Sequence, residues 1–319
     1  MLVAFPQTTA PPPAIAAGSV VLGVLGSDAE LTRRVLARRP AGVIVFRHHL
    51  ADDGRAVRAA IARGPAPRPF LLVDQEGGVV RRFAALGPLS APALGGGSPA
   101  ATRRSFRQAG RELRGRGIAL NLAPVADAAR AWSFMASRSY GGNAAWAGQH
   151  VAAAVRGLRD GGVTGCLKHY PGLGAVRINT DHGPGTDARS RRQVRRDEAA
   201  FRAGIRAGAR CVMVSNAVTP TLCTRPAVLC RSTYTRLRAL GFRGAIITDS
   251  LNAGALRAYG RPDRLAVRAL ALGADAALLT GPGSTLDSIV AVERALRDGT
   301  LMRTKVAMSA TRVRGLRLR

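Results

Sequence analysis

The chain has 319 residues, of which 47% are hydrophobic and 4% aromatic, and its 48 Lys and Arg against 19 Asp and Glu give a formal net charge of +29. This apolar content excludes a disordered chain, and the length fits one α/β barrel domain. No stretch reaches the roughly 18 uninterrupted apolar residues that a membrane-spanning helix needs.

The positive charge raises the question of a nucleic-acid partner, because a dense basic surface binds phosphates and releases counterions. The arginines, however, are spread from Arg33 to Arg319, and the only lysines are Lys168 and Lys305. No helix-turn-helix, zinc or base-stacking pattern accompanies them. We therefore predict a solvated basic surface with no specific nucleic-acid partner.

Residues 1–26 contain no basic segment followed by a continuous apolar stretch, so a standard signal peptide is not evident. We predict a poorly ordered lead over residues 1–18 and a single domain over residues 19–319. These features favour a cytoplasmic location over an exported one, but they leave export and the oligomeric state open.

Short apolar runs alternate along the domain with segments of helical periodicity. Residues 144–160 and 197–210 are two such segments, in which apolar residues recur every three or four positions. This alternation is typical of βα units, and eight units favour a closed (β/α)8 barrel of the TIM type over an open, doubly wound sheet. The eight apolar runs cover residues 19–25, 41–46, 69–74, 118–127, 164–170, 211–217, 244–250 and 274–281.

Polar side chains gather at the C-terminal ends of these runs, which is where a barrel carries its catalytic and binding residues. Two of the connections that follow, 75–100 and 171–190, are long, and long loops in compact domains usually bind ligands or cover sites. The second carries Asp181 and His182 between glycines and could swing over a site. The polar strand-end residues are Asp74, Glu76, Asp127, Lys168, His169, Asn216, Asp249 and Ser250.

The four cysteines show neither CxxC spacing nor histidines in ligand register, so we expect no metal site. We expect buried thiols instead. As an alternative, Cys223 and Cys230 flank a Thr-Arg-Pro turn and could form a disulfide in an oxidising compartment. The other two cysteines are Cys166 and Cys211.

The segment DQEGGVVRRF (74–83) combines a carboxylate, Asp74, with a guanidinium, Arg82, and both groups suit hydrogen bonds to sugar hydroxyls. Alternatively, Asp74 or Glu76 forms a salt bridge that holds the loop.

The segment LKHYPGLG (167–174) places Lys168 beside His169 at a strand end, where a lone histidine would instead make a structural hydrogen bond. IITDS (246–250) puts Asp249 where a carboxylate nucleophile is expected, unless Asp249 caps the next helix.

In this order and at this spacing, the three segments resemble glycoside hydrolase family 3, and specifically its single-domain β-N-acetylhexosaminidase branch. The resemblance covers residues from about 20 to 300 and includes AGVIVF, LNLAPVAD, SRSYGGN, VMVSNA and LALGADAALL. It implies a barrel that hydrolyses glycosidic bonds without a metal or a cofactor.

The resemblance also implies roles for individual residues. Asp249 would be the nucleophile of a retaining mechanism, in which a covalent glycosyl-enzyme forms and water later releases the sugar. The residues implied to bind the sugar before the scissile bond are Asp74, Arg82, Arg138, Lys168 and His169.

The chain departs from the resemblance at the acid/base group. Hexosaminidases of the family carry an Asp-Ser-His triplet in the mobile loop after a KHFPGHG motif, whereas counting from the motif lysine gives Asn179, Thr180 and Asp181 here. His182 comes one residue late. Register favours Asp181 as the acid/base, whereas the ability of histidine to donate and accept a proton near neutral pH favours His182.

Three further positions differ from the family pattern: Leu173 replaces the second motif histidine, Asn216 stands where the family often has His, and Ala253 replaces the usual Met. Our main hypothesis is a retaining, exo-acting β-glycosidase, a β-N-acetylhexosaminidase that acts on terminal amino sugars of cell-wall-type glycans. The first alternative is a catalytically silent barrel that binds glycans. The second, a nucleic-acid-binding protein recruited by charge, would show binding that falls steeply with salt.

Overall fold

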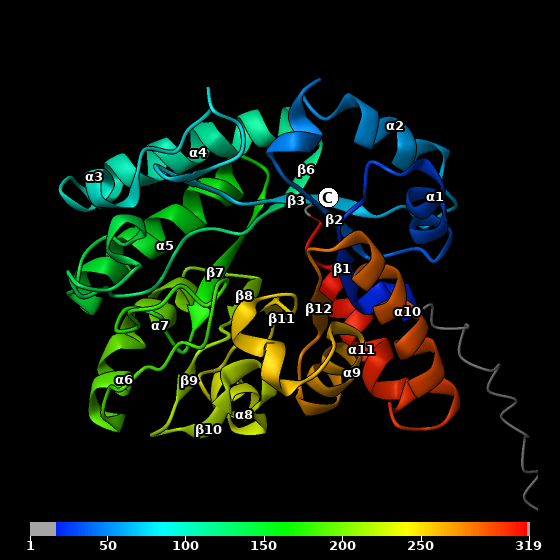
Figure 1. Ribbon diagram of the computed structural model, residues 1–319. Helices are drawn as coiled ribbons and strands as arrows, with labels where there is room; N and C mark the ends of the chain where they lie inside the picture. The colour runs from blue at the N-terminus through cyan, green and yellow to red at the C-terminus, as the bar shows by residue number, and fades with distance from the viewer. Residues whose placement is uncertain (1–16, 318–319) are drawn as a thin grey trace, which may run out of the picture.

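Eight buried strands pair in parallel and close into a barrel in the order β1-β12-β11-β8-β7-β6-β3-β2 (Figure 1). Each strand lies inside one of the eight apolar runs, so the prediction of a (β/α)8 barrel of the TIM type is confirmed. The strands are β1 (Val21–Gly23), β2 (Gly42–Val45), β3 (Phe70–Val73), β6 (Ile118–Asn121), β7 (Thr164–Tyr170), β8 (Cys211–Val214), β11 (Ala245–Ser250) and β12 (Ala276–Leu278).

The computed structural model describes residues 17–317. The predicted lead over residues 1–18 lies outside this range except for its last two residues, which begin the 3₁₀ helix η1 (Ala17–Val20). No helix within residues 17–317 is both long enough and apolar enough to cross a membrane.

Helices follow the strands and surround the barrel (Figure 1). The segment predicted helical over residues 144–160 forms α5 with these bounds, and Asn143 caps it by accepting from the backbone N–H groups of Ala145 and Trp146. The helices are α1 (Ala29–Ala37), α2 (Arg55–Arg63), α3 (Ala91–Gly95), α4 (Pro99–Gly115), α5 (Ala144–Asp160), α6 (Arg191–Asp197), α7 (Ala199–Arg206), α8 (Arg231–Ala239), α9 (Pro262–Leu272), α10 (Pro282–Arg297) and α11 (Arg303–Arg314).

The connections between the strands and helices contain further short elements. Two hairpins pair β4 with β5 and β9 with β10, and four more 3₁₀ helices, η2 to η5, lie in other connections. Their bounds are β4 (Gln75–Gly77), β5 (Val80–Arg81), β9 (Val218–Thr219), β10 (Cys223–Pro226), η2 (Arg47–Leu50), η3 (Ala136–Arg138), η4 (Ala227–Leu229) and η5 (Gly254–Tyr259).

The interior of the barrel is filled by one side-chain row from each strand. Alternate residues such as Ala245 and Ile247 of β11 join a single buried cluster with their counterparts on the other strands, and Leu316, just after α11, belongs to it as well. Because side chains alternate along a strand, the residue two positions beyond an inward-facing one also faces inward. Lys168 follows the inward-facing Cys166 in this way, and Asp249 follows Ile247.

Two disulfides contradict the expectation of buried thiols. Cys166 on β7 is bonded to Cys211 on β8, and these residues are register partners on neighbouring strands with Cα atoms 4.4 Å apart. The second disulfide joins Cys223 to Cys230, the pair that the sequence offered as an alternative. The first pair is separated by 45 residues in sequence, and only the strand pairing brings its Cα atoms within bonding range.

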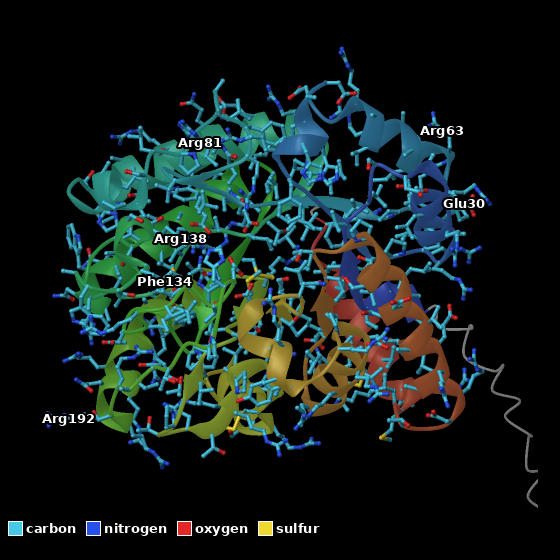
Figure 2. The ribbon with its side chains drawn as sticks, in the orientation of Figure 1. Glu30, Arg63, Arg81, Phe134, Arg138 and Arg192 are labelled. Atoms are coloured by element: carbon cyan, nitrogen blue, oxygen red, sulfur yellow. A yellow bond between two sulfur atoms is a disulfide. The ribbon has the colours of Figure 1, made fainter. Side chains whose placement is uncertain are left out.

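Exposed charged side chains lie on several sides of the barrel (Figure 2). Arg63 of α2 and Arg192 of α6, for example, are both exposed and lie on opposite sides of the molecule.

Candidate active site

A cavity of about 480 Å³ opens where the barrel strands end. Its floor includes Leu122, Met213 and Leu278, which belong to the buried interior of the barrel. All of the site residues expected from the sequence lie on its wall except His182: they are Asp74, Arg82, Arg138, Lys168, His169, Asp181 and Asp249. Arg138 is labelled in Figure 2, together with Phe134, another residue of the wall.

One side of the cavity is a cluster of paired charges. The Lys168 ammonium lies 2.6 Å from Oδ1 of Asp74 and 2.5 Å from Oε1 of Glu76, and its side chain is only 2% exposed. Arg138 donates to both carboxylate oxygens of Glu76, at 2.8 and 2.7 Å, and Arg82 lies 3.5 Å from Asp74. Both acidic residues of this segment therefore form salt bridges, as the alternative interpretation expected, and they do so at the cavity.

The cluster is ionised because each charge is compensated. Burial alone would raise the pKa of Glu76, but Lys168 and Arg138 outweigh it and lower this pKa to about 2. Burial alone would lower the pKa of Lys168, but Asp74 and Glu76 outweigh it and raise this pKa. The wall therefore presents fixed donors and acceptors, which is the arrangement that sugar hydroxyls need.

The carboxylate of Asp127 holds His169 in place. The sequence predicts that Asp127 lies at a strand end but indicates no role for it. Asp127 accepts hydrogen bonds from the Nδ1–H of His169 at 2.8 Å and from the backbone N–H groups of His169 and Leu173. Burial would raise the pKa of Asp127, but the imidazole and these hydrogen bonds lower it. With Nδ1 occupied, the Nε2 atom of His169 is the ring nitrogen that remains for a ligand.

Asp249 extends the inward-facing row of β11 into the cavity. It accepts a hydrogen bond from the backbone N–H of Ser250 at 2.7 Å, and the next helix, η5, has Ala253 at its N-cap, so Asp249 does not cap a helix. Burial raises the pKa of Asp249; the charge of Asp181 raises it further, while His169 and Lys168 oppose the shift. This carboxylate is thus partly desolvated and faces another carboxylate.

The loop over residues 171–190 brings its tip to the cavity. Asn179, Thr180 and Asp181 line the wall, in the register counted from Lys168, whereas His182 does not line it. Both Asp181 and His182 are exposed. The structure therefore places the carboxylate of this loop, rather than the imidazole, at the site.

The sequence matches the family model of the glycosyl hydrolase family 3 N-terminal domain over residues 22–316, which is nearly the whole described chain. The chain belongs to glycosyl hydrolase family 3. Together with the relatives below, this makes it a glycoside hydrolase that acts on O-glycosyl bonds.

Relatives of this family 3 enzyme agree with that assignment. A β-hexosaminidase from Stenotrophomonas maltophilia is 31% identical over 89% of the chain and 90% of its own length. An uncharacterized secreted glycosyl hydrolase from Arthroderma benhamiae is 34% identical over 87% of the chain and 84% of its own length. The structure of a family 3 β-N-acetylglucosaminidase from Paenibacillus superposes with a TM-score of 0.84 and 26% identity over 96% of the chain, which spans only 62% of that protein.

The three other departures from the family pattern sit around the site. Leu173 and Ala253 line the cavity, and Leu173 packs in a small buried cluster with Val176. Asn216 donates from its side-chain amide to the carbonyl oxygen of Ser250 at 2.8 Å, so it braces the strand end that carries Asp249.

Proposed function

We propose that this family 3 enzyme is a retaining, exo-acting β-N-acetylhexosaminidase that removes terminal amino sugars from cell-wall-type glycans. The observation that carries the proposal is the presence of two carboxylates, Asp249 and Asp181, on the wall of one cavity whose other side is the ionised cluster. The names of the relatives, β-hexosaminidase and β-N-acetylglucosaminidase, support the choice of sugar.

The geometry suits an exo-acting enzyme because the cavity has a floor. Buried side chains fill the barrel beneath it, so a glycan can insert one terminal sugar but cannot thread through. The sugar would be held through its hydroxyls by a set of donors and acceptors: Asp74, Arg82, Arg138, Lys168 and His169.

In the proposed reaction the Asp249 carboxylate attacks the anomeric carbon, and the bond to the leaving oxygen breaks. Asp181 gives its proton to that oxygen as the bond breaks. Asp181 then takes a proton from water, which attacks the glycosyl-enzyme and releases the sugar with its original anomeric configuration.

The test is turnover of a panel of β-glycosides, N-acetylglucosaminide included, by the enzyme and three variants. Asp249→Asn should abolish turnover and leave folding intact, because an amide keeps the shape but cannot form the ester. Asp181→Ala should slow substrates with poor leaving groups by about a hundred- to ten-thousand-fold, and activated aryl glycosides far less, since these need little protonation.

His182→Ala is the matched loop variant and should behave as the unmodified enzyme. A selective loss in His182→Ala instead of Asp181→Ala would move the acid/base to the imidazole. Binding of N-acetylglucosamine without turnover of any glycoside would favour the silent glycan-binding barrel.

We also propose that the enzyme works in an oxidising compartment, because two disulfides persist where thiols are not kept reduced. The secreted relative from Arthroderma benhamiae is consistent with this proposal. It departs from the cytoplasmic location that the sequence alone favoured.

A further inference from the structure

The tip of the loop that carries Asp181 rests directly on the segment that follows the nucleophile. Gly254 donates its backbone N–H to the carbonyl oxygen of Asp181 at 2.9 Å, and Ala255 donates to that of Thr180 at 3.0 Å. We propose that Gly254 is a positioning residue: its lack of a side chain lets the two loops touch and so fixes Asp181 relative to Asp249. The inference rests on the proposed function, because it assumes that Asp181 is the acid/base.

Only glycine permits this contact. A Cβ atom at position 254 would lie 2.4 Å from the carbonyl oxygen of His182, 2.5 Å from its carbonyl carbon and 2.9 Å from the carbonyl oxygen of Asp181. All three are backbone atoms, which cannot rotate away as a side chain would. Gly254 is outside the left-handed region, so alanine would suit its own backbone, and the three atoms nearest to the added Cβ all belong to the loop.

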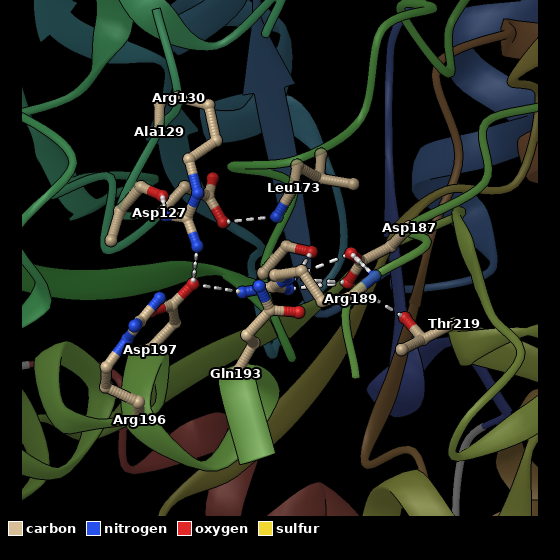
Figure 3. A network of polar contacts seen from close by, with 12 residues as sticks. Asp127, Ala129, Arg130, Leu173, Asp187, Arg189, Gln193, Arg196, Asp197 and Thr219 are labelled. Carbon is tan, nitrogen blue, oxygen red and sulfur yellow. Dashed lines mark hydrogen bonds and ion pairs between the residues drawn. The ribbon is translucent and has the colours of Figure 1, made fainter. Parts of the chain in front are cut away.

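The base of the loop is anchored elsewhere, by a buried network of charges (Figure 3). Arg189 pairs with Asp187 and Asp197 and donates to the carbonyl oxygen of Gly172, while Arg130 also pairs with Asp197. The tip of the loop is residues 177–184. Within residues 17–317, two hydrogen bonds join this tip to the rest of the protein, and Gly254 and Ala255 donate them. Arg177, at the start of this stretch, also lies over the ring of Trp132, 4.5 Å from its centroid. The docking contact therefore supplies the hydrogen bonds that fix the tip beside Asp249.

Hydrogen bonds within the tip tie Asp181 and His182 to the same residue, Asn179. Asn179 accepts from the backbone N–H of Asp181 through its side chain at 3.0 Å, and its carbonyl oxygen accepts from His182 at 3.0 Å and Gly183 at 3.2 Å. A displacement that begins at the carbonyl of His182 is thus passed to Asp181, and a shift of about 1 Å in a catalytic group can cost about a hundredfold in rate.

The experiment compares Gly254→Ala with Gly183→Ala, which adds the same methyl group to the same tip. A Cβ atom at Gly183 would lie 3.8 Å from a methyl group of Ile178, an ordinary contact, so this control should match the unmodified enzyme. For Gly254→Ala we expect kcat/KM to fall at least about tenfold for glycosides with poor leaving groups and less than about twofold for activated aryl glycosides.

The double variant with Asp181→Ala separates positioning from a general structural effect. If Gly254 acts through Asp181, adding Gly254→Ala to Asp181→Ala should cause no further loss, since the misplaced group is already absent. Should Gly254→Ala not fold, Ala255→Pro removes the other docking N–H in the first turn of η5, where proline is tolerated, and should give the same selective loss.

Equal loss on both substrate classes, or rates like the unmodified enzyme while Asp181→Ala shows its selective loss, would overturn the inference and leave the proposed function standing. If Asp181→Ala itself shows no selective loss, the proposed acid/base is wrong, and the inference falls with it.

Discussion

Glu76 offers a direct test of the ionised cluster because its carboxylate is shared by two buried cations. The Glu76→Gln substitution keeps the size of the side chain and removes its charge. Arg138 and Lys168, whose side chains are 16% and 2% exposed, would then lose their shared carboxylate. Breaking a buried ion pair by removing one partner costs about 3 to 5 kcal/mol when the remaining charge is left without compensation. Arg138 would lose its ion-pair partner, whereas Lys168 would keep Asp74, so we expect the lower end of this range.

The pKa of Glu76 gives a second value, of similar size, for the stability that this carboxylate contributes. It is lowered from its ordinary value of 4.5 to about 2 in the folded enzyme, and at about 1.4 kcal/mol for each pH unit this difference corresponds to about 3 kcal/mol of stability. Since the folded-state pKa is below the unfolded one, this stability is fully present above pH 4.5 and is lost as the pH falls towards 2.

The measurement is the free energy of unfolding in urea at pH 7 and at steps down to pH 3. We expect Glu76→Gln to be about 3 kcal/mol less stable at pH 7 and this deficit to shrink steadily below pH 4.5. Glu30→Gln is the control: Glu30 pairs with Arg33 on the exposed face of α1, and its loss should cost at most about 1 kcal/mol. A deficit that is constant from pH 7 to pH 3 would refute the assignment of the effect to the charge of Glu76.

Three further predictions concern other contacts. Asp127→Asn should lower kcat/KM about a hundredfold, measured with an aryl N-acetylglucosaminide, because His169 loses the carboxylate that orients it; an unchanged value would contradict that role. Arg189→Met should lower the free energy of unfolding by about 3 kcal/mol or more, since Asp187 and Asp197 are buried; urea unfolding beside Arg196→Met, whose side chain is 63% exposed, tests this. Enzyme made in an oxidising compartment should show no free thiol when denatured and four after reduction, and reactive thiols before reduction would argue against the disulfides.

The eight strands could be predicted from the sequence because their signal is local. A buried parallel strand needs apolar residues on both faces, and such a run is visible without knowing its neighbours. The run over residues 118–127 shows the limit of this signal: the strand ends at Asn121, and the chain continues through Pro124, which has no N–H to donate to the sheet. The positions of Lys168 and Asp249 at strand ends, and with them their place at the mouth of the barrel, also follow from local pattern.

Contacts between distant segments were decided only by the tertiary structure. The Cys166–Cys211 disulfide depends on strand register, the partners of Glu76 come from two other segments, and the contact of Gly254 with the loop depends on the path of both backbones. The choice between Asp181 and His182 for the cavity wall belongs here too, since a shift of one residue in an irregular loop leaves no periodic trace in the sequence. Periodicity specifies which way a side chain points from its own element, whereas the closing of the barrel determines which side chains meet.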